Sequence, residues 1–483
     1  MLGDLPITEY QNHTTAHPIG VIVLLLLSAA TLVAPRRWAL VPMLVMACVV
    51  ASAQRFVIAS LDFNFLRVLL LVVAFRIVIR KETIGWRWKP IDTVLVLWII
   101  CATVTAGVLY GTVQTVIYRL GILYDAVGLY FVCRILVRDW TDIRVFVQSA
   151  ALISVPVAIA FIVERATARN IFSVFGGVPE ITMMRDGRLR CQGPFSHPIL
   201  AGCFWAALMP LIAALWWHRG WNRALAITGL ASSMVVVVTC ASSTPVGGVL
   251  AGVVAACLFP LRRRMAWVRW FAVLTIISLH LVMKAPVWHL ISRVSFAQGS
   301  TGWYRYKLID DFIRHFDEWW LIGTSSRASW FGEGYWQITN QYVAEGVNGG
   351  LLTLTLFFIL IAFAFYGVGR TWRRAARRRY RLLPLDRSAP HQPPPRPARP
   401  KSSAHLAMAW ALGVSLFVHC VMFTGVTYFG QSILVWYLTL AFIGSLTPIH
   451  RRRGVLLARL KGHRPSSVVR FATRRPGVPV AGA

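Results

Sequence analysis

Long apolar stretches recur along almost the entire chain and alternate with short polar or basic segments. Most of them contain about 16–23 residues, the length at which an α-helix crosses a hydrocarbon core of about 30 Å. The pattern predicts an all-α fold, a polytopic transmembrane bundle of about 12–13 spans. The expected spans are residues 19–34, 38–53, 57–78, 93–110, 113–134, 144–163, 194–217, 224–240, 245–260, 266–283, 349–367, 405–427 and 431–448.

The polar segments divide the chain into four parts: 1–283 with the first ten spans, 284–348 as a large extracytoplasmic loop, 349–448 with the last three spans, and 449–483 as a basic cytoplasmic tail. An outer loop at 164–193 interrupts the first part. A basic, proline-rich cytoplasmic loop at 368–404, which the composition predicts to be disordered, interrupts the third.

The large loop contains one segment with helical periodicity. Between Trp303 and Trp320, apolar residues recur on one face, at positions 303, 306, 309, 313, 316 and 320. An amphipathic helix with aromatic residues on this stripe is expected to lie in the membrane interface, either as simple packing or as a lid over a lipid-linked substrate. Asp310 and Asp311 are expected to belong to its water-facing side.

Composition excludes a large soluble helical protein. Only 14% of the 483 residues are charged and 57% are hydrophobic, whereas soluble domains carry about 25% charged residues. The net charge of +32 is concentrated in two segments: 368–404 holds eleven Lys or Arg and one acid, and 449–483 holds nine and none. Such segments lie against anionic headgroups, so membrane lipids rather than nucleic acid are the expected partners.

The distribution of charge also predicts the orientation. If the acidic N-terminus lies outside, the C-terminal tail and five basic connections between spans all fall inside. These connections are 36–37, 76–89, 134–144, 219–223 and 262–264. The loop at 284–348, with six basic and six acidic residues, falls outside. The positive-inside rule therefore predicts a multi-pass protein of a bacterial inner membrane, with an outer N-terminus and a cytoplasmic C-terminus.

Arg67 and Asp125 are charged residues inside apolar stretches. Because a charge is costly in lipid, both are expected to face the interior of the bundle. We expect them to form a structural ion pair with each other, with a substrate site as the alternative.

The candidate chemistry lies in the two outer loops and consists mainly of arginines. Arg188 and Arg190 precede a Gly-Pro turn where a span begins, and Arg293 and Arg305 lie in the larger loop. Guanidinium groups bind phosphate oxygens bidentately, and in a partly desolvated site they stabilise the charge of a departing diphosphate. The four arginines are therefore candidate diphosphate-binding residues, with anchoring to lipid headgroups as the alternative.

Four local motifs accompany these arginines. They are Arg188-x-Arg190-x-x-Gly193-Pro194-Phe195-x-His197-Pro198, Ser242-Ser243-Thr244-Pro245-Val246-Gly247-Gly248, Trp320-Leu321-Ile322-Gly323, and Asn340-Gln341-Tyr342 followed by Gly349-Gly350. Their order within the topology, over roughly residues 60–445, resembles the superfamily of O-antigen ligases and O-antigen or exopolysaccharide polymerases. Members of that superfamily are membrane helical bundles with a large periplasmic loop between two late spans.

The resemblance implies an integral membrane glycosyltransferase of surface polysaccharide assembly. Its donor would be a glycan linked to undecaprenyl diphosphate and its acceptor a glycan or lipid hydroxyl, with other polysaccharide export proteins as further partners. The transfer would be inverting and would need no cofactor and no metal, since arginines would neutralise the diphosphate. Arg305 and His197 would be catalytic, and Asn340, Tyr342 and His315 are further candidates.

One position departs from the family pattern. The ligases place a histidine, thought to be the base for the acceptor hydroxyl, just before the Asn-x-Tyr motif, whereas this chain has Thr339. A threonine hydroxyl does not act as a base near neutral pH. His197, His289, His315 and Glu333 are other bases in the loops, and capping of a helix is the alternative role for His197. The departure favours a polymerase or a divergent relative over ligation to lipid A.

Two other classes of protein remain open. A transporter or flippase of lipid-linked oligosaccharides would concentrate polar residues along a central path and contain inverted repeats, whereas the polar residues here gather in the outer loops. A catalytically inactive relative that scaffolds an export complex is the other alternative, because Thr339 replaces the expected base.

Overall fold

A computed structural model of the chain describes residues 13–59, 61–293, 302–325, 330, 338–381 and 401–448. Within these residues, eight helices are long and apolar enough to cross a membrane: α4 (Pro90–Tyr110), α5 (Val113–Leu136), α6 (Trp140–Thr167), α7 (Pro198–Ala214) with its 3₁₀ extension η4 (Leu215–His218), α8 (Trp221–Thr239), α10 (Met265–Val282), α15 (Gln341–Arg381) and α16 (Lys401–Met422). Three shorter apolar helices accompany them: α1 (Pro18–Val33), α9 (Ser243–Cys257) and α17 (Ser432–Leu446). The predicted all-α polytopic bundle is confirmed.

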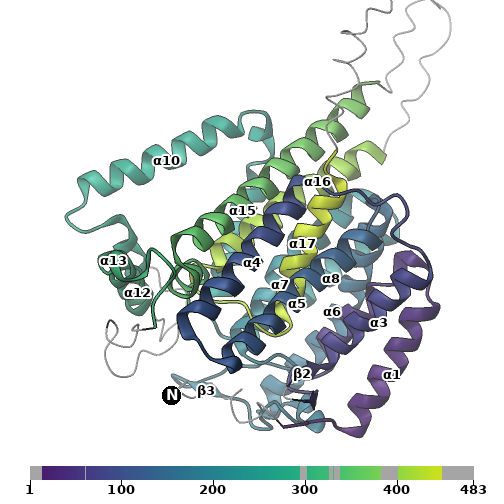
Figure 1. Cartoon of the computed structure of the whole chain (residues 1–483). Coiled ribbons are helices and arrows are strands. Elements are labelled where there is room, and N and C mark those ends of the chain that lie inside the picture. Colours follow the sequence, from purple (N-terminus) through teal and green to yellow (C-terminus); the bar gives the residue numbers. More distant parts are fainter. Residues whose placement is uncertain are drawn as a thin grey trace, which may run out of the picture. The chain divides into compact units, whose positions relative to one another are not determined.

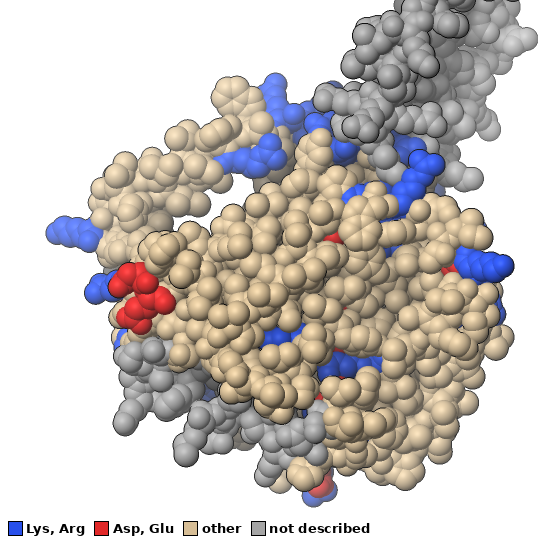
Figure 2. Space-filling view, viewed as in Figure 1, with Lys and Arg blue, Asp and Glu red and all other residues tan. Residues whose placement is uncertain are grey.

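Except for α10, which lies apart from the bundle, the long helices pack side by side around α7 and α17 (Figure 1). Both helices are apolar on all sides and almost fully buried, as expected for helices that have no polar face. Gly202 in α7 allows a close approach, because a Cβ atom there would lie 2.6 Å from the Sγ atom of Cys240. On the face seen in Figure 2, charged side chains are sparse and the surface is largely uncharged.

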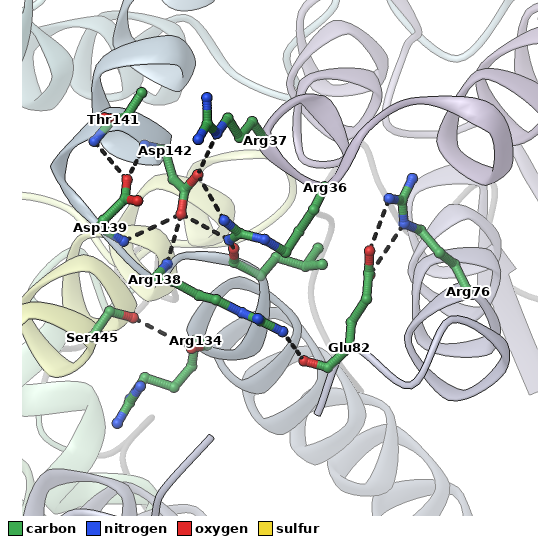
Figure 3. A network of polar contacts seen from close by, with 11 residues as sticks. Arg36, Arg37, Arg76, Glu82, Arg134, Arg138, Asp139, Thr141, Asp142 and Ser445 are labelled. Carbon is green, nitrogen blue, oxygen red and sulfur yellow. Dashed lines mark hydrogen bonds and ion pairs between the residues drawn. The ribbon is translucent and has the colours of Figure 1, made fainter. Parts of the chain in front are cut away.

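The polar connections between helices gather at two ends of the bundle. The end that we call the basic end carries the connections at 34–40, 80–89, 137–139, 215–220 and 258–264. There, Arg36 pairs with Asp142 at 2.8 Å and Arg76 pairs with Glu82 at 3.0 Å (Figure 3). The other end, which we call the loop end, carries the segments at 50–64, 168–197, 240–242, 302–325 and 423–431.

The predicted ion pair inside the bundle is confirmed. The Nε and Nη2 atoms of Arg67 donate to the two carboxylate oxygens of Asp125 at 2.8 and 2.7 Å. Arg67 belongs to α3 (Phe65–Ile79) and Asp125 to α5. Each charge is therefore neutralised by a bidentate partner.

The second and third predicted spans are wrong in their extent. Residues 38–53 contain only a 3₁₀ turn, η2 (Arg36–Trp38), and a nine-residue helix, α2 (Val41–Val49). Residues 57–58 and 61–64 of the next predicted span belong to the antiparallel strands β1 (Arg55–Ile58) and β2 (Leu61–Asn64). The apolar side chains of 57–63 were read as helix, but they are largely β-branched or aromatic and suit a strand equally well.

The boundary of the basic loop at 368–404 is also wrong. α15 continues to Arg381 and α16 starts at Lys401, so the first fourteen residues of this expected loop are helical. Arginine and alanine are good helix formers, and this lets the helix extend past the apolar stretch. Residues 382–400, with the prolines, and the tail at 449–483 lie outside the described residues.

Paired glycines join the large loop to α15. Gly350 interrupts that helix with φ 73° and ψ −177°, and the Leu351 N–H then donates to the carbonyl of Trp320 at 2.8 Å. Cβ atoms at Gly323 and Gly350 would lie 2.3 and 2.4 Å from backbone oxygens of the facing segment. Only glycine fits at these two places, which explains why the Leu-Ile-Gly and Gly-Gly motifs occur together.

Candidate functional site

A short hairpin shapes the outer loop that carries the first arginines. β3 (Met184–Arg185) pairs antiparallel with β4 (Arg188–Leu189). The turn between them has a positive φ at Asp186 (51°) and Gly187 (72°). Asp-Gly is favoured in two-residue turns of this kind, so the local sequence fixes the register of the hairpin.

Glu164, near the end of α6, holds the following part of the loop. Its buried carboxylate accepts hydrogen bonds from the hydroxyl of Thr182 at 3.1 Å and from the backbone N–H groups of Gln192 at 3.0 Å and Gly193 at 2.9 Å. Three donors from the loop thus converge on one side chain. This positions residues 190–197 over the end of the bundle.

Arg190 and His197 lie in the segment that Glu164 positions. Arg190 is 6% exposed, and its Nε atom is buried with no hydrogen-bond partner among the described residues. Burial, together with the charge of Arg185, lowers the pKa of Arg190. An arginine nevertheless stays protonated, so the loop places a permanent charge in a poorly solvated position.

His197 caps the first turn of α7, because its Nδ1 atom accepts from the N–H of Ile199 at 3.2 Å. Burial and the charges of Arg190 and Arg185 lower the pKa of His197 to about 4. A neutral imidazole that accepts at Nδ1 carries its proton on Nε2, so His197 offers a hydrogen-bond donor rather than a basic lone pair. Its role as a general base stays a prediction.

Arg305 reaches the bundle from the large loop. It lies in α12 (Gly302–Arg314), and its Nη2 atom donates to the hydroxyl of Thr244 at 2.8 Å and to that of Ser243 at 3.4 Å. A Cβ atom at Gly425 would lie 3.2 Å from the Cζ atom of Arg305, so the glycine gives the guanidinium room. The Nε atom of Arg305 is buried with no hydrogen-bond partner among the described residues.

The two loops that carry the candidate arginines both contact the turn between α8 and α9. The N–H of Cys191 donates to the carbonyl of Thr239 at 3.1 Å, which places the Arg190 segment on one side of this turn. Arg305 binds Ser243 and Thr244 on its other side. The positive charge of Arg185 contributes to lowering the pKa of Arg190, His197 and Arg305, so one arginine acts on both loops.

Only two of the four candidate diphosphate-binding arginines lie at this turn. Arg190 and Arg305 lie at the site, whereas Arg188 is exposed on the hairpin. Arg293 ends the short helix α11 (Leu290–Arg293), and its side chain lies outside the described residues. Arg185, the cross-strand partner of Arg188, is also exposed and pairs with Asp186 at 3.5 Å, but its charge acts on Arg190, His197 and Arg305.

Sequence reasoning did not place Arg185 or Gly425 at the site, and it named Ser243 and Thr244 only as part of the motif at 242–248. The Asp-Gly turn was a usable signal for Arg185, because it predicts a hairpin and not an irregular loop. No local signal identified Ser243, Thr244 or Gly425 as neighbours of Arg305. Their role depends on a contact between segments about sixty and more than a hundred residues apart along the chain.

The further candidates mainly hold the loops in place. The side-chain oxygen of Asn340 accepts from the N–H groups of Tyr342 at 2.9 Å and Val343 at 3.2 Å, which starts α15. The hydroxyl of Tyr342 donates to the carbonyl of Cys420 at 2.9 Å. Beside them, the hydroxyl of Thr339 is buried with no hydrogen-bond partner among the described residues.

His315 lies at a break in the loop helix. Its Nδ1 atom is 2.8 Å from the carbonyl of Asp311, and its ring stacks on Trp330 with centroids 4.8 Å apart. The single helix expected between Trp303 and Trp320 is divided there into α12 and α13 (Phe316–Trp319). The helical periodicity was read correctly, but its continuity was not.

The amphipathic helix packs on the protein by a different face from the predicted stripe. Leu308, Phe312 and Trp319 form its contact with the protein, whereas Trp303 and Trp320 on the predicted stripe are 55% and 47% exposed. An exposed apolar stripe suits a helix in the membrane interface.

The expectation that Asp310 faces water is wrong. It is buried, and it accepts from the indole of Trp288 at 3.1 Å and pairs with Arg314 at 2.8 Å.

The arrangement forms a cationic site at the start of α9. Ser242, the N-cap residue, makes no side-chain capping hydrogen bond, so the first turn of α9 presents its positive end to the site. Among the described residues, Arg190 and Arg305 form no ion pair with a carboxylate. Guanidiniums in a poorly solvated position beside a helix N-terminus can bind a phosphate or diphosphate anion.

In comparisons with known proteins, no family model and no curated protein matches this chain.

Proposed function

We propose that this membrane protein transfers or polymerises glycans carried on undecaprenyl diphosphate, in the assembly of an O-antigen or exopolysaccharide. The observation that carries the proposal is a pair of arginines, the buried Arg190 and the partly buried Arg305, which come from separate loops to the same turn. Clustered positive charges without a carboxylate partner are unfavourable unless an anion completes the site. A membrane-bound diphosphate would supply the negative charge that balances these arginines.

In the proposed reaction, an acceptor hydroxyl attacks the anomeric carbon of the carrier-linked sugar from the face opposite the diphosphate. A new C–O bond forms while the bond to the diphosphate breaks, and the diphosphate leaves with the electron pair. Arg190 and Arg305 would stabilise this developing charge, and Arg185 would add to the positive field. The base that takes the hydroxyl proton is unassigned, because Thr339 cannot do so near neutral pH.

Glycan analysis of a strain that lacks the protein tests this function. We expect the polymer to be missing, with single repeat units accumulating on the carrier at the outer face of the membrane. Full-length polymer on the carrier, missing only from its final acceptor, would indicate a ligase. Accumulation at the cytoplasmic face would contradict transfer and favour the flippase alternative, whereas a normal polymer level would exclude both functions.

We also propose that the loop end is extracytoplasmic and that the C-terminal tail is cytoplasmic. The proposal is supported by the positive-inside rule, because arginine-rich connections gather at the basic end. Reporter fusions after residues 330 and 395 are expected to report opposite sides, with 330 outside. Reporters that indicate the same side at both positions would contradict this topology.

A further inference from the structure

A cavity of about 380 Å³ opens at the basic end of the bundle, far along the helices from the arginine site. It lies between the first turn of α6, the extension η4 and the first turns of α16. The residues that line it are Trp140, Thr141, Arg144, His218, Ala404 and His405. Three of the six have nitrogen-containing basic side chains, and none is acidic.

The walls of this cavity carry one permanent positive charge, that of Arg144, beside the imidazoles of His218 and His405. Trp140 and His405 stack with their ring centroids 5.1 Å apart and their planes 15° from parallel, which fixes the orientation of the imidazole. The Nε atom of Arg144 is buried with no hydrogen-bond partner among the described residues. A buried guanidinium donor that lacks a protein acceptor is suited to an anionic ligand.

The acidic groups nearest to the cavity are committed elsewhere. Asp139 caps α6 by accepting from the N–H groups of Thr141 at 2.8 Å and Asp142 at 3.1 Å. Asp142 accepts a hydrogen bond from the guanidinium of Arg36 at 2.8 Å (Figure 3). Because Asp139 already occupies the helix N-terminus, an anion in the cavity would be held by the side chains of Arg144, His218 and His405.

The cavity lies at the depth of lipid headgroups. Trp216, Trp217 and Trp221 are exposed along and just after η4, which forms one of its walls. Exposed tryptophans gather where a membrane protein crosses the boundary between hydrocarbon and water. A ligand in the cavity is therefore next to the phosphate layer of the bilayer, where basic pockets between helices bind anionic headgroups.

We propose that this cavity binds the phosphate group of an anionic phospholipid such as phosphatidylglycerol. The lipid would connect α6, η4 and α16 at the basic end. This proposal does not rest on the proposed glycan transfer at the loop end, so the two can be tested separately.

Native mass spectrometry of the detergent-solubilised full-length protein tests the site. Phosphatidylglycerol and phosphatidylcholine with the same acyl chains are added in parallel. We expect the protein to retain phosphatidylglycerol more tightly, and Arg144→Gln to weaken that retention about tenfold, equivalent to about 1.4 kcal/mol. If Arg144→Gln fails to fold, His218→Gln replaces it in the test. This variant removes a second cavity side chain and should also weaken the retention of phosphatidylglycerol.

Arg223→Gln is the matched control. Arg223 lies at the same end but packs over the ring of Trp216 at 5.0 Å and does not line the cavity, so its replacement should leave retention unchanged. Equal retention of the two lipids, or equal loss in the Arg223 variant, would overturn the proposal. Inorganic phosphate that binds as tightly as the lipid would assign the cavity to a soluble anion instead and would also overturn it.

Discussion

Replacing Arg305 with Lys is expected to reduce polymer assembly by roughly thirty- to a thousandfold while the protein inserts normally, a loss of about 2–4 kcal/mol of transition-state stabilisation. The guanidinium uses Nη2 to bind Thr244 and keeps a second donor, Nε, buried and without a partner among the described residues. Lysine keeps the charge but has one terminal nitrogen, so it cannot occupy both positions. The measurement is polymer level at matched amounts of membrane-inserted protein.

Arg314→Lys is the control for this prediction. Arg314 lies on the same helix, but its side chain is 71% exposed and pairs with Asp310. A lysine there retains the charge in a solvated position, so polymer assembly should remain near the normal level. Normal assembly by Arg305→Lys, together with loss in Arg314→Lys, would contradict the assignment of the diphosphate site.

The bundle was largely predictable because each long helix contains an apolar stretch that the chain must bury in lipid or protein. The errors fall where the apolar pattern and the backbone structure diverge. Residues 57–58 and 61–64 were predicted as part of a span but belong to the strands β1 and β2. At α15, the helix continues for fourteen residues past the end of the predicted apolar span.

The site was predictable in its residue type but not in its membership. Arginines in these two loops were identified from chemistry alone, and Arg190 and Arg305 lie in segments that contact the same turn. Arg185, which is exposed and pairs with Asp186, acts on the site through its charge, which helps to lower the pKa of His197. The contact between Arg305 and Thr244 crosses sixty residues of sequence, and no local periodicity can predict such a contact.

Glu164 illustrates a different gap between sequence and structure. It lies near the end of an apolar stretch, where an acid is easily taken for a residue that faces water. The structure instead buries it under the loop that it organises, with three loop donors on its two oxygens. Its effect on the arginine site is indirect, so it is a positioning residue.

Glu164→Ala is therefore expected to release the loop and abolish polymer assembly. The substitution leaves two backbone N–H groups and one hydroxyl without their acceptor, at about 1–3 kcal/mol for each buried donor. Cys191 reports the opening directly, because it is fully buried and burial raises the pKa of its thiol to about 12. Maleimide labelling of Cys191, mapped by peptide mass spectrometry, should accelerate by at least about a hundredfold, since each 1.4 kcal/mol corresponds to a factor of ten.

Glu180→Gln is the matched control, because Glu180 lies in the same loop in an exposed pair with Arg169. Such pairs contribute little to stability, so Cys191 should remain protected and polymer should be made. Glu164→Gln should fall between the two, since it keeps one oxygen acceptor but turns an amide N–H₂ group toward a donor. If Glu164→Ala leaves Cys191 protected yet abolishes assembly, Glu164 takes part in the reaction itself and does not act by positioning the loop.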